Sequence, residues 1–141
     1  MKVAHQYIEE HKLLLNKWLG SWNLEEYKTT VQNFNKMNEK LDIKYVIQDI
    51  SDLSFDDDFV DFIDVLVGIR NQIVKKDYRV VYLTAKPKDV VFASLYSHEL
   101  KTKDSYMYCS TVKKALHLLN VRVPEYIIEE IFLVLKKQVL S

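Results

Sequence analysis

Apolar residues recur along the chain at two alternating spacings, one typical of strands and the other typical of helices. The segments 4–9 and 12–19 are extended and apolar with a polar turn between them, and they predict an opening β-hairpin. From residue 24 to residue 41 the apolar positions are three or four residues apart, which places them on one face of a helix. Asn23 followed by Glu26 is a typical start for that helix.

The alternation of strands and helices continues to the end of the chain. The pattern predicts, in order, strand 44–50, helix 59–74, strand 79–84, helix 88–100, strand 106–109, helix 112–119 and helix 124–140. Polar residues 51–54 read as the loop after the strand 44–50. Successive strands joined through helices cross over right-handedly and lie parallel. We therefore predict an α/β fold with a mainly parallel sheet of four to five strands, an N-terminal antiparallel hairpin at its edge, and helices packed on the sheet.

The length of the chain suits one compact unit. Its 141 residues are 48% hydrophobic, enough for a single core without a metal or disulfide. We expect residues 1–120 to form the α/β domain, and residues 121–141 to add a C-terminal amphipathic helix to the same unit. Two glycines and two prolines are too few for a turn-rich all-β fold, and they cannot form a glycine-rich phosphate loop.

Charge and metal-ligand chemistry narrow the function further. Twenty basic residues balance twenty acidic ones, so the sequence predicts no nucleic-acid partner. The single cysteine cannot form a CxxC motif, and the four histidines show no metal-binding spacing, so we expect no metal and no cofactor. The sequence contains no run of about eighteen apolar residues, which predicts no transmembrane segment and a cytoplasmic protein.

Three stretches of the sequence carry a resemblance to a known family. They are 17–27 (KWLGSWNLEEY), 45–53 (YVIQDISDL) and 109–119 (CSTVKKALHLL). Together they resemble the STAS-like superfamily, which has the fold of sporulation anti-sigma-factor antagonists and is similar in shape to the CRAL-TRIO lipid-transfer domain. The resemblance covers about residues 1–120. It implies a small bacterial member that acts without catalysis, as a regulatory or protein-interaction domain.

One segment departs from the pattern of that family. In anti-sigma-factor antagonists an Asp-Ser-x-Gly turn after the central strand presents the serine that a kinase phosphorylates. This chain has Phe55-Asp56-Asp57-Asp58-Phe59 there, with an acidic residue in place of the serine. Control by phosphorylation at this turn is therefore not expected. The carboxylates either imitate the phosphorylated form or, as the helix dipole favours, cap and solvate the start of the next helix.

The same segment is unusually acidic. Seven aspartates lie between residues 49 and 64, and no lysine or arginine occurs from Tyr45 through Ile69. A solvated acidic face is the favoured interpretation, ahead of a protein-binding surface and of a cation site, for which the glycine of a calcium loop is missing. Asp49 is a strand-end residue that either faces a ligand or bonds its own backbone, and the second is favoured. The candidate partner-binding residues are Ser54, Asp56, Asp57, Asp58 and Asp61.

Two alternatives concern apolar surfaces. The C-terminal helix has a wide apolar face that either covers the sheet or pairs with a second copy, and its candidate residues for self-association as a homodimer are Ile128, Ile131, Phe132 and Leu135. The similarity to the CRAL-TRIO domain implies an alternative function, a carrier of a lipid or another small apolar ligand in a pocket lined by aromatic residues. These residues are Tyr7, Trp18, Tyr27, Phe34, Tyr82, Phe92 and Tyr96.

No catalytic residues are predicted. Cys109 with His98 or His117 would supply a nucleophile and a base, but the sequence gives no sign that they lie close together. A lone cysteine in an apolar strand is more typical of a core position. We therefore expect a protein that is not an enzyme.

Overall fold

The opening hairpin forms from residues that are close in sequence. The computed structural model describes residues 1–56, 58–74, 78–100 and 106–140. Strands β1 (Lys2–Ile8) and β2 (Leu13–Ser21) pair antiparallel, and the short 3-10 helix η1 (Glu9–His11) turns the chain between them. The predicted hairpin is confirmed, and β1 forms one edge of the sheet.

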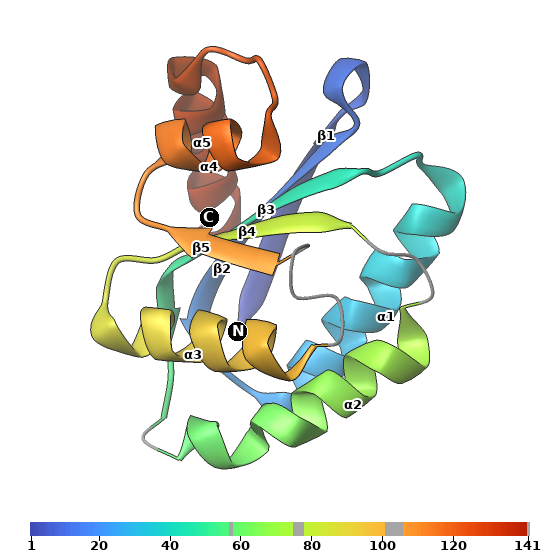
Figure 1. The fold of residues 1–141 in the computed structure, drawn as a ribbon, viewed down its shortest axis with the longest axis vertical. Coiled ribbons are helices and arrows are strands. Elements are labelled where there is room, and N and C mark those ends of the chain that lie inside the picture. Colours follow the sequence, from blue (N-terminus) through green and yellow to red (C-terminus); the bar gives the residue numbers. More distant parts are fainter. Residues whose placement is uncertain (57, 75–77, 101–105, 141) are drawn as a thin grey trace.

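Three further strands extend the sheet in chain order. These are β3 (Tyr45–Ser54), β4 (Arg79–Leu83) and β5 (Tyr106–Cys109), and the strand order is β1-β2-β3-β4-β5. Every pair from β2 to β5 is parallel, as Figure 1 shows. Most residues of the central strands are buried, the polar Asn16, Lys17 and Asp49 among them, because helices cover both faces of the sheet. The α/β fold with a mainly parallel sheet is confirmed.

Three helices cover one face of the sheet. They are α1 (Leu24–Lys40), α2 (Ile63–Ile73) and α3 (Pro87–Glu99). The amide of Glu26 donates to the Asn23 side chain at 3.0 Å, which confirms the predicted start of α1. The core under these helices is rich in aromatic rings, among them Trp18, Tyr82 and Phe92.

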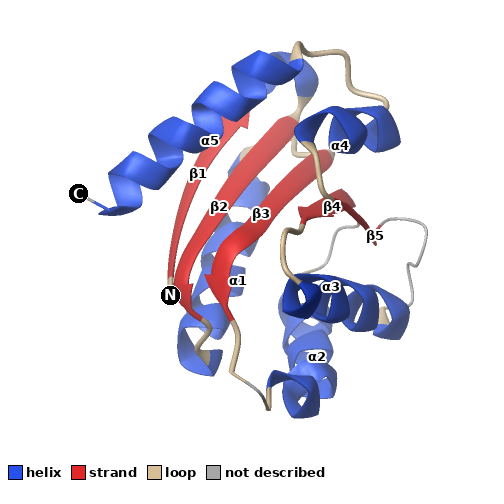
Figure 2. Ribbon diagram, turned by 90° about the vertical axis from the view of Figure 1, so that its left-hand side faces the viewer, coloured by secondary structure: helices blue, strands red, loops and turns tan. Residues whose placement is uncertain are grey.

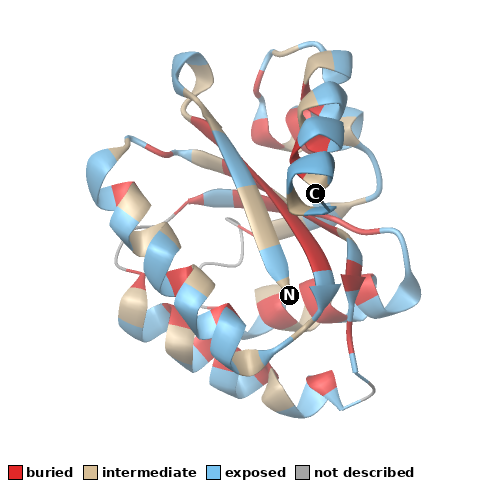
Figure 3. Cartoon of the chain, turned by 180° about the vertical axis from the view of Figure 1, so that it is seen from behind, coloured by how far each residue is buried: buried red, intermediate tan, exposed pale blue. Residues whose placement is uncertain are grey.

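The last two helices cover the other face. They are α4 (Val112–Leu119), which Thr111 caps, and α5 (Glu125–Leu140). Helix α5 lies across β1 and β2, beside α4 (Figure 2). The core on this side is mostly aliphatic, and Leu13 and Leu15 of β2 meet the inward side of α5 there. Buried residues follow the central strands and the inward faces of the helices (Figure 3).

Two boundaries differ from those predicted. Residues 51–54 are not a loop, because β3 continues to Ser54 in parallel register with the end of β2. The helix predicted from residue 59 begins instead as a 3-10 turn, η2 (Phe59–Phe62), and becomes α-helical at Ile63. Within the described residues, no helix is both long and apolar enough to cross a membrane.

Candidate functional site

The acidic segment divides into a first half, whose carboxylates are paired with lysines of the chain, and an exposed half. Asp49 lies opposite Lys17 in the register of β2 and β3, and the Lys17 ammonium contacts its carboxylate at 2.9 Å. Both side chains are almost completely buried. A buried charge is strongly disfavoured without a partner, so each of these two residues requires the other.

The second oxygen of Asp49 is also occupied. Its Oδ1 accepts hydrogen bonds from the Ser51 amide at 3.0 Å and from the Ser51 hydroxyl at 2.5 Å. The interpretation of Asp49 as a residue that bonds its own backbone is therefore confirmed. The prediction that Asp49 ends the strand was wrong, because it lies in the middle of β3.

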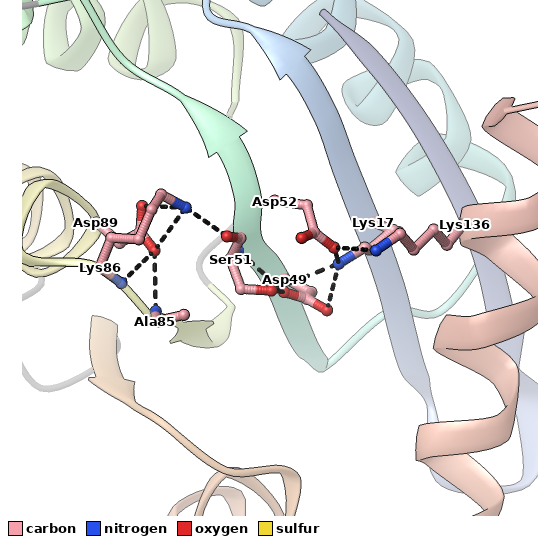
Figure 4. A network of polar contacts seen from close by, with 8 residues as sticks. All are labelled: Lys17, Asp49, Ser51, Asp52, Ala85, Lys86, Asp89 and Lys136. Atoms are coloured by element: carbon pink, nitrogen blue, oxygen red, sulfur yellow. Dashed lines mark hydrogen bonds and ion pairs between the residues drawn. The ribbon is translucent and has the colours of Figure 1, made fainter.

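Asp52 joins β3 to the C-terminal helix. Its carboxylate contacts the Lys17 ammonium at 2.7 Å and the Lys136 ammonium, on α5, at 3.1 Å. The hydrogen bond from Lys17, and then the contact with Lys136, hold the pKa of Asp52 below its usual range. We call Lys17, Asp49, Ser51, Asp52 and Lys136 the Lys17 network, which Figure 4 shows. It borders a groove of about 340 Å³ beside α5.

A further ion pair, Lys86 with Asp89, lies at the start of α3 and contacts β3. Asp89 is fully buried, and its Oδ2 accepts from the amides of Ala85 and Lys86, each at 2.9 Å. The Lys86 ammonium contacts Asp89 at 3.3 Å and also donates to the Ser51 carbonyl. These contacts fix the first turn of α3 against β3. The carboxylates of Asp49, Asp52 and Asp89 thus all have lysine partners within the chain. This arrangement holds β2, β3, α3 and α5 together.

The exposed half of the acidic segment follows the end of β3. Ser54, Asp56, Asp58 and Asp61 are exposed there, and we call them the acidic surface. Asp57 was also predicted to bind a partner and lies outside the described residues. The Asp58 side chain makes no capping hydrogen bond to η2 among the described residues. The interpretation of these residues as helix caps therefore does not account for Asp58.

Aromatic residues hold the acidic surface in place. Phe55 and Phe59 are buried on either side of the aspartates, with ring centroids 5.1 Å apart. Phe55 also stacks on Phe92 of α3 at 4.8 Å. Because the two phenylalanines are buried in the core, Asp56 and Asp58 between them are left at the surface. The structure thus gathers Ser54, Asp56 and Asp61 at the carboxyl end of β3, where ligands commonly bind to parallel sheets.

The residues predicted for self-association lie mostly inside the chain. Ile128, Phe132 and Leu135 are buried in the core between α5 and the sheet, and Ile131 packs at its margin. At these positions α5 therefore covers the sheet, which was one of the two predicted roles of this helix. They offer a second copy little surface, and the exposed apolar residues of α5 are different ones.

An aromatic-lined cavity lies between the sheet and α1. It has a volume of about 60 Å³, and Trp18, Tyr27 and Tyr96 are among its lining residues. The hydroxyl groups of Tyr27 and Tyr96 are 3.0 Å apart, and burial raises the pKa of both phenols. Small-molecule pockets usually measure roughly 300–1,000 Å³. An apolar ligand of ordinary size would need the helices to move, and the carrier function stays a prediction.

The hydrogen-bond partner of the Cys109 thiol among the described residues is a backbone carbonyl and not a histidine. Burial raises the pKa of the half-buried Cys109 thiol, and the thiol donates to the carbonyl of Thr111 at 3.4 Å. His98 is on α3 and His117 is on α4, and these helices cover opposite faces of the sheet. A raised pKa leaves less thiolate at neutral pH. Within the described residues, no group of histidine, cysteine or carboxylate side chains could hold a metal ion.

Comparison with known proteins gives similarity in fold but not in sequence. No family model matches the chain, and no curated protein matches it. Among solved structures, the anti-sigma factor antagonist SpoIIAA in its unphosphorylated form is similar with a TM-score of 0.53 and 11% identity, over 86% of this chain and all of that one. The Bacillus cell fate determinant SpoIIAA in its phosphorylated form has a TM-score of 0.45 and 13% sequence identity, over 82% of this chain and 99% of that one. The chain therefore has the fold of SpoIIAA, as the STAS-like resemblance predicted.

Proposed function

We propose that this chain is a non-enzymatic regulatory domain of the STAS type, which acts by binding another protein. The observation that carries the proposal is the fold shared with SpoIIAA over 86% of this chain. SpoIIAA is described as an antagonist of an anti-sigma factor, so a domain of this shape can act on a protein. Since a fold does not by itself fix a function, the binding site is argued from the surface of this chain.

The acidic surface is the binding site that the contacts favour. The carboxylates of the Lys17 network have partners inside the chain, whereas Asp56, Asp58 and Asp61 are exposed on a base of buried phenylalanines. Val60 lies among them and is also exposed. A partner that presents lysine or arginine side chains around a small apolar contact would complement this surface in charge and in shape.

The charge of this surface is permanent. Anti-sigma-factor antagonists are expected to carry a phosphorylatable serine in this turn, and a phosphate group there adds a charge of about −1.5 to −2. This chain has aspartates in the same turn, which are negatively charged without phosphorylation. Binding at the acidic surface would therefore persist without a kinase. Salt would weaken it, because exposed charges are screened over about 8 Å at physiological ionic strength.

Affinity capture tests the proposal. The wild-type protein and the variant Asp56→Asn/Asp58→Asn/Asp61→Asn are used to capture proteins from an extract of the source cells, and the captured proteins are quantified by mass spectrometry. We expect one protein to bind the wild type in stoichiometric amount, and its affinity for the variant to fall by at least about tenfold in calorimetry.

A matched variant controls for the change in net charge. Glu9, Glu10 and Glu39 are exposed near the other end of β2 and β3, so Glu9→Gln/Glu10→Gln/Glu39→Gln should keep full binding. Equal loss in both variants, or no loss in the first, would contradict the proposed site. Native mass spectrometry of the purified wild type separates the carrier function, because a bound small apolar molecule in place of a protein would support that alternative.

A further inference from the structure

The outward face of α5 carries an apolar stripe. Tyr126, Leu133 and Leu140 are seven residues apart and 61%, 60% and 69% exposed, and Val134 beside them is 50% exposed. Seven residues make about two helical turns, so the three side chains lie along one side of the helix, roughly 10 Å apart. This side is opposite the one that Ile128 and Leu135 bury against the sheet. Figure 2 shows α5 as an outer layer over β1 and β2.

Charged residues flank the stripe in an ordered way. Glu129 and Glu130 precede Leu133, whereas Lys136 and Lys137 follow it. If two such helices packed in parallel, glutamate would face glutamate and lysine would face lysine. If they packed antiparallel around Leu133, Glu130 of each copy would face Lys137 of the other. The arrangement of charge is therefore complementary to a second copy of the same helix in one orientation only.

We propose that two copies of this chain associate through the outward faces of α5, antiparallel and symmetric about Leu133. In this arrangement Leu133 meets its equivalent in the second copy, and Tyr126 packs on Leu140 of that copy at each end. Glu130 and Lys137, both exposed, form the flanking ion pairs on one side. Lys136 already contacts Asp52 within the chain, so the charge argument rests on Glu130 and Lys137. A two-fold pair of this kind is closed and does not extend into a filament.

The proposed dimer is separate from the proposed partner site. Helix α5 covers the face of the sheet opposite to α2, and the acidic surface precedes α2. Dimer formation would therefore leave the acidic surface accessible. One helix of 16 residues spans about 24 Å and buries less area than a stable interface of roughly 1,200–2,000 Å², so we expect a dissociation constant in the micromolar range.

Analytical ultracentrifugation over about 1 μM to about 1 mM measures this association. The wild type is expected to change from monomer to dimer across the series, and Leu133→Glu should weaken association at least about thirtyfold, because it buries two carboxylates at the axis. Val65→Glu is the matched control, since Val65 is 45% exposed on α2, and it should dimerise as the wild type does. Circular dichroism establishes that each variant folds.

Charge reversal tests the orientation. Glu130→Lys alone places lysine against lysine, and Lys137→Glu alone places glutamate against glutamate, so each should dimerise several-fold more weakly than the wild type. An equimolar mixture of the two restores both ion pairs and should dimerise more tightly than either alone. A wild type that stays monomeric at the highest concentration, a Leu133→Glu variant that still dimerises, or a mixture no tighter than its components would overturn the proposal.

Discussion

The two halves of the acidic segment have similar composition and opposite environments. Asp49 and Asp52 lie within β3, where Lys17 of β2 and Lys136 of α5 neutralise them. Asp56, Asp58 and Asp61 lie only a few residues later and face solvent. Two of the seven aspartates belong to the first half, and the sequence did not distinguish them from the others. The structure separates carboxylates that hold the fold together from carboxylates that remain available to a partner.

The difference teaches that burial, and not the local density of charge, decides what an acidic residue does. In the first half Asp49 is buried, and its desolvation must be offset by the close positive charge of Lys17, which Asp52 also contacts, so the loss of Lys17 affects both carboxylates. In the exposed half water solvates each charge separately, so a substitution changes mainly the surface potential. Mutations in the two halves should therefore differ strongly in their effect on stability.

The largest effect is expected when Lys17 is replaced. Lys17→Met leaves the buried carboxylate of Asp49 without its counter-charge, and the free energy of unfolding should fall by about 3–5 kcal/mol. Unfolding in urea measures this loss. Lys136→Met is the matched control, because the ion pair of Lys136 with Asp52 is partly exposed. This substitution should lower the free energy of unfolding by no more than about 1 kcal/mol. Equal losses for the two variants would show that burial does not distinguish them.

A double variant sharpens this result. Lys17→Met/Asp49→Leu removes both buried charges, so it should recover part of the stability lost in Lys17→Met. The recovery would identify the unpaired carboxylate, and not lost packing of the lysine stem, as the cause. A double variant less stable than Lys17→Met would point to packing.

An intermediate effect is expected at low pH. The pKa of Asp52 is lowered in the folded state from 3.8, mainly by the hydrogen bond from Lys17, so its stabilising contribution is complete above about pH 4 and is lost as the pH falls further. Asp52→Asn lacks this titration. The difference in unfolding free energy between wild type and Asp52→Asn should therefore shrink on acidification below pH 4. A difference that stays constant over this range would contradict the assigned role of Asp52.

The smallest effect is expected for the acidic surface. Each of Asp56→Asn, Asp58→Asn and Asp61→Asn should change the free energy of unfolding by no more than about 0.5 kcal/mol, because these side chains are exposed. Thermal unfolding measures the change. A loss of several kcal/mol in any of them would place that aspartate with the structural carboxylates and remove it from the proposed partner site.

Local sequence was sufficient for much of the fold. The cap formed by Asn23, the periodic spacing of α1 and the short turn of the hairpin all depend on residues a few positions apart, and all three were predicted correctly. The alternation of strands and helices also predicted the parallel sheet, because crossover connections admit few arrangements.

The parts that could not be predicted depend on distant residues. Ser51, Asp52 and Ser54 are polar and resemble a loop. However, Asp52 is neutralised within the strand by Lys17, more than thirty residues earlier, and by Lys136 of α5. Nothing local signals either contact. Lys17, flanked by apolar residues inside the segment 12–19, was an available indication, since a buried lysine needs a counter-charge. The wide apolar face of α5 likewise did not reveal which side turns inward.

The position of α5 has a consequence for synthesis of the protein. Strands β1 and β2 are made before the other described strands, and Leu13 and Leu15 of β2 are covered by α5, which is made after the other described helices. Until the ribosome has released that helix, this aliphatic side of the nascent hairpin remains open to water and to other chains. This face can therefore fold only after α5 has been made, and until then the hairpin is a segment that a chaperone would have reason to shield.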